Sequence, residues 1–348
     1  MPEEEADLAW ARAGLAHYDV PVERWTPMGW GRVRIDGGGR CYEARRLGDA
    51  AARWRTAVTD VCAGRGFRRT QRPLATLYLE RWVRLADGSA VLLVDVFAGH
   101  PLEPVPQDVD AAARNLGRLH RALDGAGAHP DLHDLPTRRG SWVDHLRAGR
   151  DALAAERLLA GDRSEPARAT GPLTGPATGG RTWMAWLDRW AETADRAVAA
   201  LERSGYAERA GEAARRREIA WNGYRLQNLV RTRGGRIATL QLVDPVVDAR
   251  LFDLATLCHE VCLGDHAGGV AEALSAYRAE APLDADEADM VRAFAAFPHH
   301  AVQWLRTWRA ARGATGLPPG WERMAARHQQ AAGALLGRFR GDDVGAAT

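Results

Sequence analysis

The chain of 348 residues is too long for one small module and fits one large domain or two lobes. With 46% apolar and 26% charged residues, its composition excludes wholesale disorder. All 47 basic residues are arginines, which excludes every mechanism that needs a lysine, and the net charge of +2 gives no electrostatic reason to expect nucleic acid or a membrane as partner.

The first hundred residues predict a small antiparallel sheet that carries one helix. Alternating apolar residues indicate strands, and apolar residues at helical spacing indicate helices. The predicted elements are, in order, a helix (3–17), two strands (31–36 and 40–46), a helix (49–63) and two strands (75–85 and 90–96).

The rest of the chain predicts mostly helices. They cover 108–123, 141–159, 182–203, 253–261, 268–279, 284–297, 299–313 and 318–339, with a short hairpin in 219–247 around Gly234 and Gly235. Trp183, Trp186 and Trp190 form one stripe on the third of these helices, which favours core packing. Residues 161–180 are rich in Gly, Pro, Ser and Thr and predict a flexible loop.

The expected fold class is therefore α+β and bilobal. A sheet lobe spans 1–98, a hinge 99–107, a helical lobe 108–339 and a tail 340–348. The acidic start and the lack of 18 consecutive apolar residues predict cytoplasmic synthesis. The four cysteines are too few for a disulfide framework.

Cys258 and Cys262 lie four residues apart around His259, a spacing that puts two ligands on one helix face. A metal site and a pair of buried thiols both fit this pattern, and the second is the expectation.

This order of elements is typical of bilobal phosphotransferases. Such enzymes need a cation on a sheet strand to hold phosphates and a carboxylate to orient or deprotonate the acceptor hydroxyl. An Asn five residues after that carboxylate and an Asp beyond the next strand hold Mg²⁺.

The chain resembles the aminoglycoside phosphotransferase-like superfamily with a protein-kinase-like fold, and within it the CotS-type spore-coat proteins of endospore-forming bacteria. The resemblance covers about residues 18–339. It rests on the order and spacing of eight stretches: GGRCYEARRL (38–47), VLLVDVFAGHPL (91–102), NLGRLHRAL (115–123), LERSGYAER (201–209), YRLQNLV (224–230), LVDPVVDARLFDLATL (242–257), AYRAEAPLDADE (276–287) and AFAAFPHHAVQWLRTW (293–308).

The resemblance implies a catalytic loop of the pattern His-Gly-Asp, four residues, then Asn. Asn228 fills the Asn position, so Trp221, Asn222 and Gly223 stand at the first three positions. Gly223 has no side chain and can neither accept a proton nor orient a hydroxyl. No intact catalytic residue is therefore expected.

The resemblance also implies four further roles. The strand lysine position falls on Glu43 or Arg45, and the helix acid that would pair with it on Asp60. Asp244 takes the metal-binding position together with Asn228, and Asp253 that of an acid that ties down the loop. The implied cofactor-binding set is thus Arg45, Asp60, Asn228 and Asp244.

Each position also has an ordinary structural interpretation. These are a turn cap for Asn228, a strand-end turn for Asp244, a helix N-cap for Asp253, a solvated strand arginine for Arg45, packing or a hydrogen bond to a loop for His120, and surface or interface positions for His299 and His300.

Taken together, these features predict a degenerate phosphotransferase that acts as a spore-coat or spore-associated protein. They favour a protein that is not an enzyme. Its partners would be other coat proteins and a nucleotide or small ligand, with no nucleic acid and no membrane. Retained ATP with Mg²⁺ and no cofactor at all both stay open. The alternatives are an active aminoglycoside- or choline-type kinase in which Asp248 replaces the missing base, and an interaction module with a collapsed cleft.

Overall fold

The structure is a computed structural model that describes residues 2–162, 179–240, 245–264, 268–310 and 320–340. The chain forms two compact units. The sheet unit comprises Met1–Glu103, Arg114–Thr137 and Ala213–Asp253, and the helical unit comprises Pro104–Ala113, Arg138–Glu212 and Leu254–Thr348. Most of the loop predicted over 161–180 and of the tail predicted over 340–348 lies outside the described residues.

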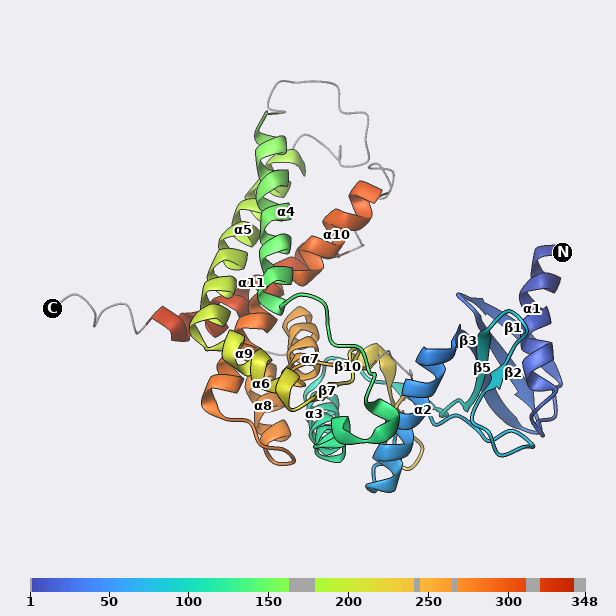
Figure 1. Ribbon diagram of the computed structural model, residues 1–348. Helices are drawn as coiled ribbons and strands as arrows, with labels where there is room; N and C mark the ends of the chain where they lie inside the picture. The colour runs from blue at the N-terminus through green and yellow to red at the C-terminus, as the bar shows by residue number, and fades with distance from the viewer. Residues whose placement is uncertain (1, 163–178, 241–244, 265–267, 311–319, 341–348) are drawn as a thin grey trace. The chain divides into compact units, whose positions relative to one another are not determined.

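A five-stranded antiparallel sheet is the centre of the sheet unit (Figure 1). In sheet order it consists of β1 (Arg24–Gly29), β2 (Arg32–Gly37), β3 (Arg40–Gly48), β5 (Ser89–Asp95) and β4 (Val83–Arg84). Side chains alternate between the two faces of a strand, so Tyr42 and Ala44 of β3 share one face while Glu43 and Arg45 share the other.

One helix covers each face of this sheet. On one face, α1 (Pro2–Leu15) packs Trp10, Ala11 and Leu15 against apolar side chains of the strands. A Cβ added at Gly14 would lie 2.7 Å from the Val91 side chain, so a glycine allows the close approach of α1 to β5. On the other face, Ala52 of α2 (Asp49–Gly64) packs against strand residues of β5.

The remainder of the sheet unit forms a second group of helices and strands. It contains the C-terminal part of α3 (Pro106–Leu123), the three-stranded sheet β6 (Gly99–Pro101), β8 (Leu229–Thr232) and β9 (Ile237–Thr239), and the pair β7 (Ile219–Ala220) and β10 (Val246–Val247). The hairpin predicted around Gly234 and Gly235 is confirmed, because β8 pairs with β9 and Gly235 adopts a φ of 73° at the turn.

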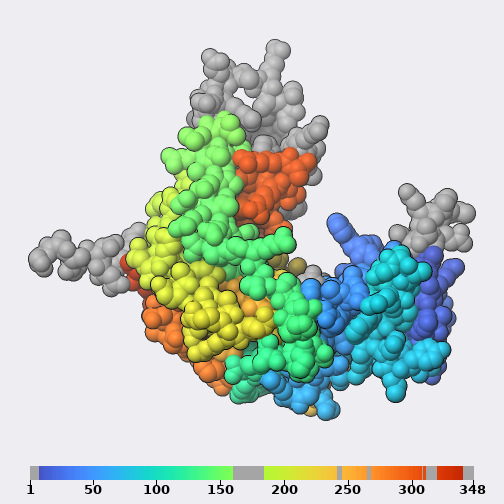
Figure 2. Space-filling model, in the orientation of Figure 1, coloured from blue at the N-terminus to red at the C-terminus, as the bar shows by residue number. Residues whose placement is uncertain are grey.

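The helical unit consists of α-helices around an aromatic core. They are α4 (Trp142–Asp162), α5 (Gly179–Arg203), α6 (Tyr206–Arg215), α7 (Leu251–Leu263), α8 (Gly269–Arg278), α9 (Ala285–Ala296), α10 (His299–Ala310) and α11 (Trp321–Gly337); the last residues of α6 and the first residues of α7 belong to the sheet unit. Helices α4 and α5 run side by side, as their green and yellow-green surfaces show (Figure 2). Trp186 and Trp190 are buried as predicted, whereas the Trp183 side chain lies outside the described part.

The predicted fold class is confirmed, with local differences. Strands β1 and β6 and helix α6 were not predicted, and the strand predicted over 75–85 is only the two-residue β4. There, the Thr76 hydroxyl accepts hydrogen bonds from the backbone N–H groups of Tyr78 and Glu80. This turn leaves Leu77 and Leu79 exposed, so their alternation reflects a loop and not a strand.

Candidate active site

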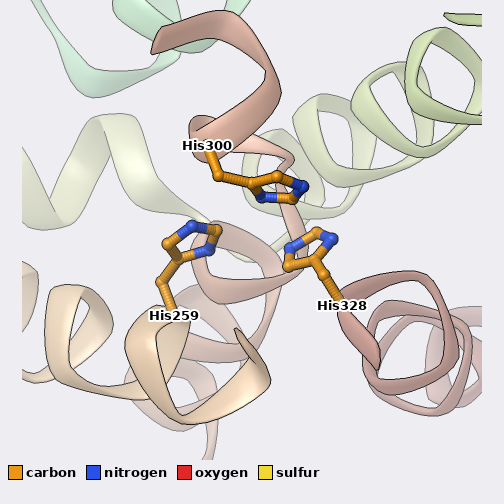
Figure 3. A group of neighbouring side chains, drawn as sticks. All are labelled: His259, His300 and His328. Atoms are coloured by element: carbon orange, nitrogen blue, oxygen red, sulfur yellow. The ribbon is translucent and has the colours of Figure 1, made fainter. Parts of the chain in front are cut away.

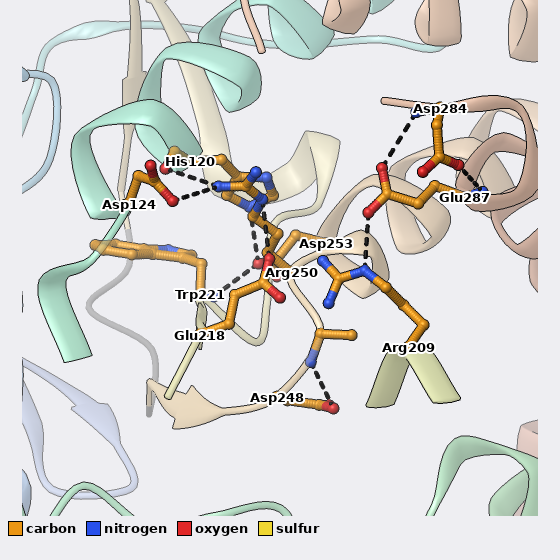
Figure 4. A network of polar contacts seen from close by, with 11 residues as sticks. His120, Asp124, Arg209, Glu218, Trp221, Asp248, Arg250, Asp253, Asp284 and Glu287 are labelled. Atoms are coloured by element: carbon orange, nitrogen blue, oxygen red, sulfur yellow. Dashed lines mark hydrogen bonds and ion pairs between the residues drawn. The ribbon is translucent and has the colours of Figure 1, made fainter. Parts of the chain in front are cut away.

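The loop between β7 and β8, residues 221–228, is fixed by one buried carboxylate. Asp253 accepts hydrogen bonds from the backbone N–H groups of Trp221 at 2.6 Å and Asn222 at 2.8 Å (Figure 4). Its Oδ2 also lies 3.2 Å from His120 Nε2, and the residue is 1% exposed. A buried carboxylate needs such donors, so Asp253 is the loop-tying acid that the sequence predicts.

His120 holds this carboxylate from α3. Burial lowers the pKa of His120 below its usual value, against the opposing effect of the bond to Asp253. The ring is therefore neutral near pH 7 and donates from Nε2. The guanidinium of Arg250 borders the same cluster, 3.0 Å from Glu218 and 3.4 Å from the His120 carbonyl oxygen. The hydrogen bond of His120 therefore goes to Asp253 in the first turn of α7 and not, as predicted, to a loop.

Two further features define the conformation of this loop. Asn222 has a φ of 61°, a left-handed conformation that glycine adopts freely and that asparagine tolerates better than most residues. Asn228 donates from Nδ2 to the Gly223 carbonyl oxygen at 2.9 Å, which closes the loop and leaves its Oδ1 as an acceptor. Gly223, the position to which the resemblance assigns an acid, has no side chain.

At the strand lysine position, Glu43 and Arg45 bind each other. Arg45 donates from Nε and Nη2 to the two carboxylate oxygens of Glu43 at 2.8 and 3.2 Å, and both residues are 5% exposed. Arg32 donates to the same carboxylate at 2.5 Å, while Arg45 also contacts Gln71 and the Leu240 carbonyl oxygen. The solvated arginine that the ordinary interpretation expects is therefore wrong, because Arg45 is buried.

This pairing fixes the charge state of Glu43. Burial alone raises the pKa of its carboxyl, but the hydrogen bonds and charges of Arg32 and Arg45 outweigh it and lower the pKa below its usual value. Glu43 is therefore ionised at neutral pH and neutralises the cation of Arg45. A phosphate group would have to compete with this carboxylate for the guanidinium.

Asp60 does not pair with Arg45, contrary to the expectation. Its carboxylate accepts from Arg72 Nε at 3.0 Å and lies 3.7 Å from Arg81 Nε. Both arginines come from the segment between α2 and β4, which the helical pattern of 49–63 could not reveal. Asp60 therefore anchors that segment.

A groove in the sheet unit runs beneath β2 and β3. One hollow of about 280 Å³ is lined by Met28, Arg32, Arg34, Cys41, Glu43, Gln71, Val96, Gln227, Asn228 and Leu240. A neighbouring hollow of about 600 Å³ shares Arg34, Cys41 and Val96 with it. Neither Trp221 nor Arg45 is among the described residues that line them. These side chains do not line the groove, and its volumes are in the range of small-molecule sites.

Asp248, the alternative base, lies at the end of β10. Strand β10 pairs with β7 so that Val247 faces Ile219, and the Asp248 N–H donates to the Glu218 carbonyl oxygen. Asp248 thus lies opposite Glu218, five residues before Gly223, at the other end of β7 from the loop. Asp244, the predicted metal ligand, lies outside the described residues, so its role stays a prediction.

Two further predictions concern the helical unit. Cys258 and Cys262 are buried free thiols, and burial raises the pKa of Cys262 to about 12. His300 is buried, so the expected surface position is wrong for this residue. Within the described residues, every helix is too short or too polar to pass through a lipid bilayer.

Solved structures share this fold. The chain superposes on an aminoglycoside phosphotransferase from Alicyclobacillus acidocaldarius with a TM-score of 0.74 at 17% identity, covering 94% of this chain and 95% of the other. For amicoumacin kinase bound to AMP-PNP and Ca²⁺, the TM-score is 0.59 at 12% identity, covering 97% and 96%. For choline kinase from Streptococcus pneumoniae, it is 0.50 at 10% identity, covering 97% and 100%.

No family model matches the sequence, and no curated protein matches it. The structural similarity defines the class: the chain has the kinase-like fold of aminoglycoside phosphotransferases and related small-molecule kinases. Below 25% identity, this likeness concerns the fold alone.

Proposed function

We propose that this protein is a degenerate phosphotransferase that binds a nucleotide-like ligand and protein partners without fast phosphoryl transfer, as a spore-coat or spore-associated protein. The observation that carries the proposal is Gly223, which offers no carboxylate in a loop whose backbone is otherwise held in place by Asp253. The resemblance of eight sequence stretches to CotS-type proteins supports the spore-coat setting.

Two independent changes weaken phosphoryl transfer. General acid–base assistance is worth roughly 10²–10⁴ in rate, or about 3–5 kcal/mol of barrier, and Gly223 cannot supply it. Positioning of the phosphates and Mg²⁺ electrostatics supply most of the rest, and they need an available cation on the strand. The bidentate pair with Glu43 occupies Arg45 instead.

The groove supports ligand binding. It is open in the sheet unit, Asn228 lines it, and Arg32 and Arg34 lie there as partners of Glu43 and Asp36. Amicoumacin kinase, which shares the fold, has been captured with AMP-PNP and Ca²⁺. We infer that the ligand is ATP or a related nucleotide, with Mg²⁺ held by Asn228 and Asp244.

An activity assay separates this proposal from an active small-molecule kinase. Purified protein is incubated with ATP, Mg²⁺ and a panel of aminoglycosides, choline and other hydroxylated amines, and phosphorylated product is measured. We expect no turnover above the blank. Robust turnover that Asp244→Ala abolishes and the exposed control Asp286→Ala retains would defeat the proposal.

A thermal-shift measurement tests ligand binding separately. A nucleotide that binds only the folded chain raises its Tm. Arg34 and Arg24 both pair with Asp36, but only Arg34 lines the groove. We expect Mg²⁺-ATP to raise the Tm of the wild type and of Arg24→Ala, and to raise that of Arg34→Ala less. No shift in the wild type would leave protein partners alone as the function.

A further inference from the structure

Three buried histidines meet in the helical unit. His259 lies on α7, His300 on α10 and His328 on α11, and each offers a ring nitrogen within 4.8 Å of the others. All three rings face a common centre (Figure 3). Among the described residues, no carboxylate or thiol joins this group.

Backbone carbonyls fix the protonation of two of these rings. His259 Nδ1 lies 3.0 Å and His328 Nε2 lies 3.2 Å from the same acceptor, the Ala295 carbonyl oxygen. A carbonyl can only accept, so each of these nitrogens carries the hydrogen. In a neutral imidazole, the remaining nitrogen, Nε2 of His259 and Nδ1 of His328, then carries the lone pair that a metal needs. In this structure Nε2 of His328 faces the other two rings, so the His328 ring has to turn for its Nδ1 to face them (Figure 3).

The third ring makes the cluster hard to explain by protein contacts alone. Neither ring nitrogen of His300 has a hydrogen-bond partner, nor does Nδ1 of His328, and all three atoms are buried. A buried polar atom without a hydrogen bond destabilises the folded chain. Aromatic packing accounts for the position of the His300 ring, which lies 4.8 Å from the Trp304 ring and 5.9 Å from that of Trp190, but it does not satisfy the nitrogens.

We propose that His259, His300 and His328 form a structural Zn²⁺ site that links α7, α10 and α11. Zn²⁺ binds neutral imidazole nitrogens at roughly 2.0–2.1 Å, so three ligands around one ion lie about 3.4 Å apart. One nitrogen of each ring already lies within 4.8 Å of one nitrogen of each other ring, and rotation of the rings about χ2 brings the nitrogens with lone pairs toward this spacing. A water completes the tetrahedron, and the burial of all three ligands excludes substrate access.

Metal analysis and spectroscopy test this site in the full-length protein. The metal-free chain is titrated with Zn²⁺ against a chromophoric chelator and, separately, with Co²⁺ while the visible d–d absorption is recorded. We expect one equivalent of Zn²⁺, a Co²⁺ spectrum typical of tetrahedral coordination, and a Zn²⁺-induced rise in Tm that EDTA reverses.

Matched variants assign the ligands. His328→Gln and His300→Gln should weaken Zn²⁺ binding at least tenfold and remove the Tm rise. His145→Gln makes the same replacement at an exposed position of α4 and should bind as the wild type does. Circular dichroism before the titration shows which variants fold. The Co²⁺ spectrum of the wild type tests the site even if a variant does not fold. Absence of stoichiometric Zn²⁺ binding, or binding that both folded variants retain, would overturn the proposal.

Discussion

The loop anchor at Asp253 and the strand pair of Glu43 and Arg45 both bury a carboxylate in the sheet unit, but the two carboxylates do different work. Asp253 accepts from two backbone N–H groups and a neutral histidine. Glu43 accepts from two arginines, one of which stands at the position where a phosphate-binding cation is expected.

The difference shows how a fold can keep its shape while its chemistry changes. Backbone N–H groups are present whatever residue stands at 221 or 222, so the loop stays anchored although the resemblance would place His and Gly there. A contact made by a side chain, in contrast, is lost when that residue is replaced. Gly223 carries no side chain, and Glu43 and Arg45 bind each other, so neither position offers the free acid or cation that the resemblance implies.

The largest expected effect is the loss of the anchor. Asp253→Ala leaves the N–H groups of Trp221 and Asn222 and the ring of His120 without their acceptor. Breaking a buried charged network typically costs about 3–5 kcal/mol. We expect a loss of that size in the free energy of unfolding, measured with urea.

Asp253→Asn should lose less, because one carbonyl oxygen remains as an acceptor. Asp286→Asn, an exposed acid in the first turn of α9, should change stability by less than about 0.5 kcal/mol. A loss below 1 kcal/mol for Asp253→Ala would show that the loop holds its conformation without the anchor.

The strand pair comes next, and a double-mutant cycle measures it. Arg45→Met removes one of the two arginines from Glu43, and Arg32 keeps the carboxylate partly paired, so we expect a loss of about 2–3 kcal/mol. Glu43→Leu should cost a similar amount because it leaves Arg45 buried. The double variant should be more stable than the sum of the single losses predicts, since apolar side chains can replace a buried ion pair. Additive losses would contradict a direct interaction.

Much of the fold could be predicted because its elements bury regular stripes. Helices α2 and α3 begin and end within two residues of their predictions, since apolar periodicity and glycine stops mark them. Strand β1 was not predicted because its residues are almost all exposed and include Pro27. Over 75–85 the alternation is genuine, but a side-chain-capped turn overrides it.

The site could be predicted only where spacing along the chain carries the signal. The positions of Asn228 and Asp253 were predicted from their spacing in the sequence motifs that carry the resemblance. The partner of Arg45 proved to be its strand neighbour Glu43, and Gln71 comes from an irregular segment with no pattern. The three clustered histidines lie 41 and 28 residues apart on separate helices, so only the tertiary structure brings them together.

A smaller effect is the pH dependence that the loop anchor contributes. Burial lowers the pKa of His120 in the folded chain, whereas the unfolded chain has the usual value near 6.5. As the pH falls below 6.5, His120 therefore binds a proton in the unfolded chain before it does so in the folded chain. The free energy of unfolding, which is at its full value above pH 6.5, decreases as the pH falls towards the pKa of the folded chain. One group gives a slope of at most about 1.4 kcal/mol per pH unit.

His120→Asn isolates this contribution. Asp253, Arg250 and Glu218 supply the charges around the ring and stay in place in the variant. We expect the unfolding free energy of the wild type to fall more steeply between pH 7 and 5 than that of His120→Asn. His133→Asn, at an exposed position, should keep the wild-type slope. Equal slopes in all three proteins would show that His120 does not exclude the proton.

The smallest expected effect concerns the backbone that the anchor holds. At a φ of 61°, a residue with a Cβ is strained and glycine is not, although glycine also gains more freedom in the unfolded chain. These effects offset each other, so Asn222→Gly should stay within about 0.5 kcal/mol of the wild type while Asn222→Ala loses about 1 kcal/mol. Urea unfolding of both variants checks the difference. If alanine is tolerated as well as glycine, the left-handed conformation at 222 is not enforced by Asp253, and the anchor holds the loop less tightly than its three hydrogen bonds imply.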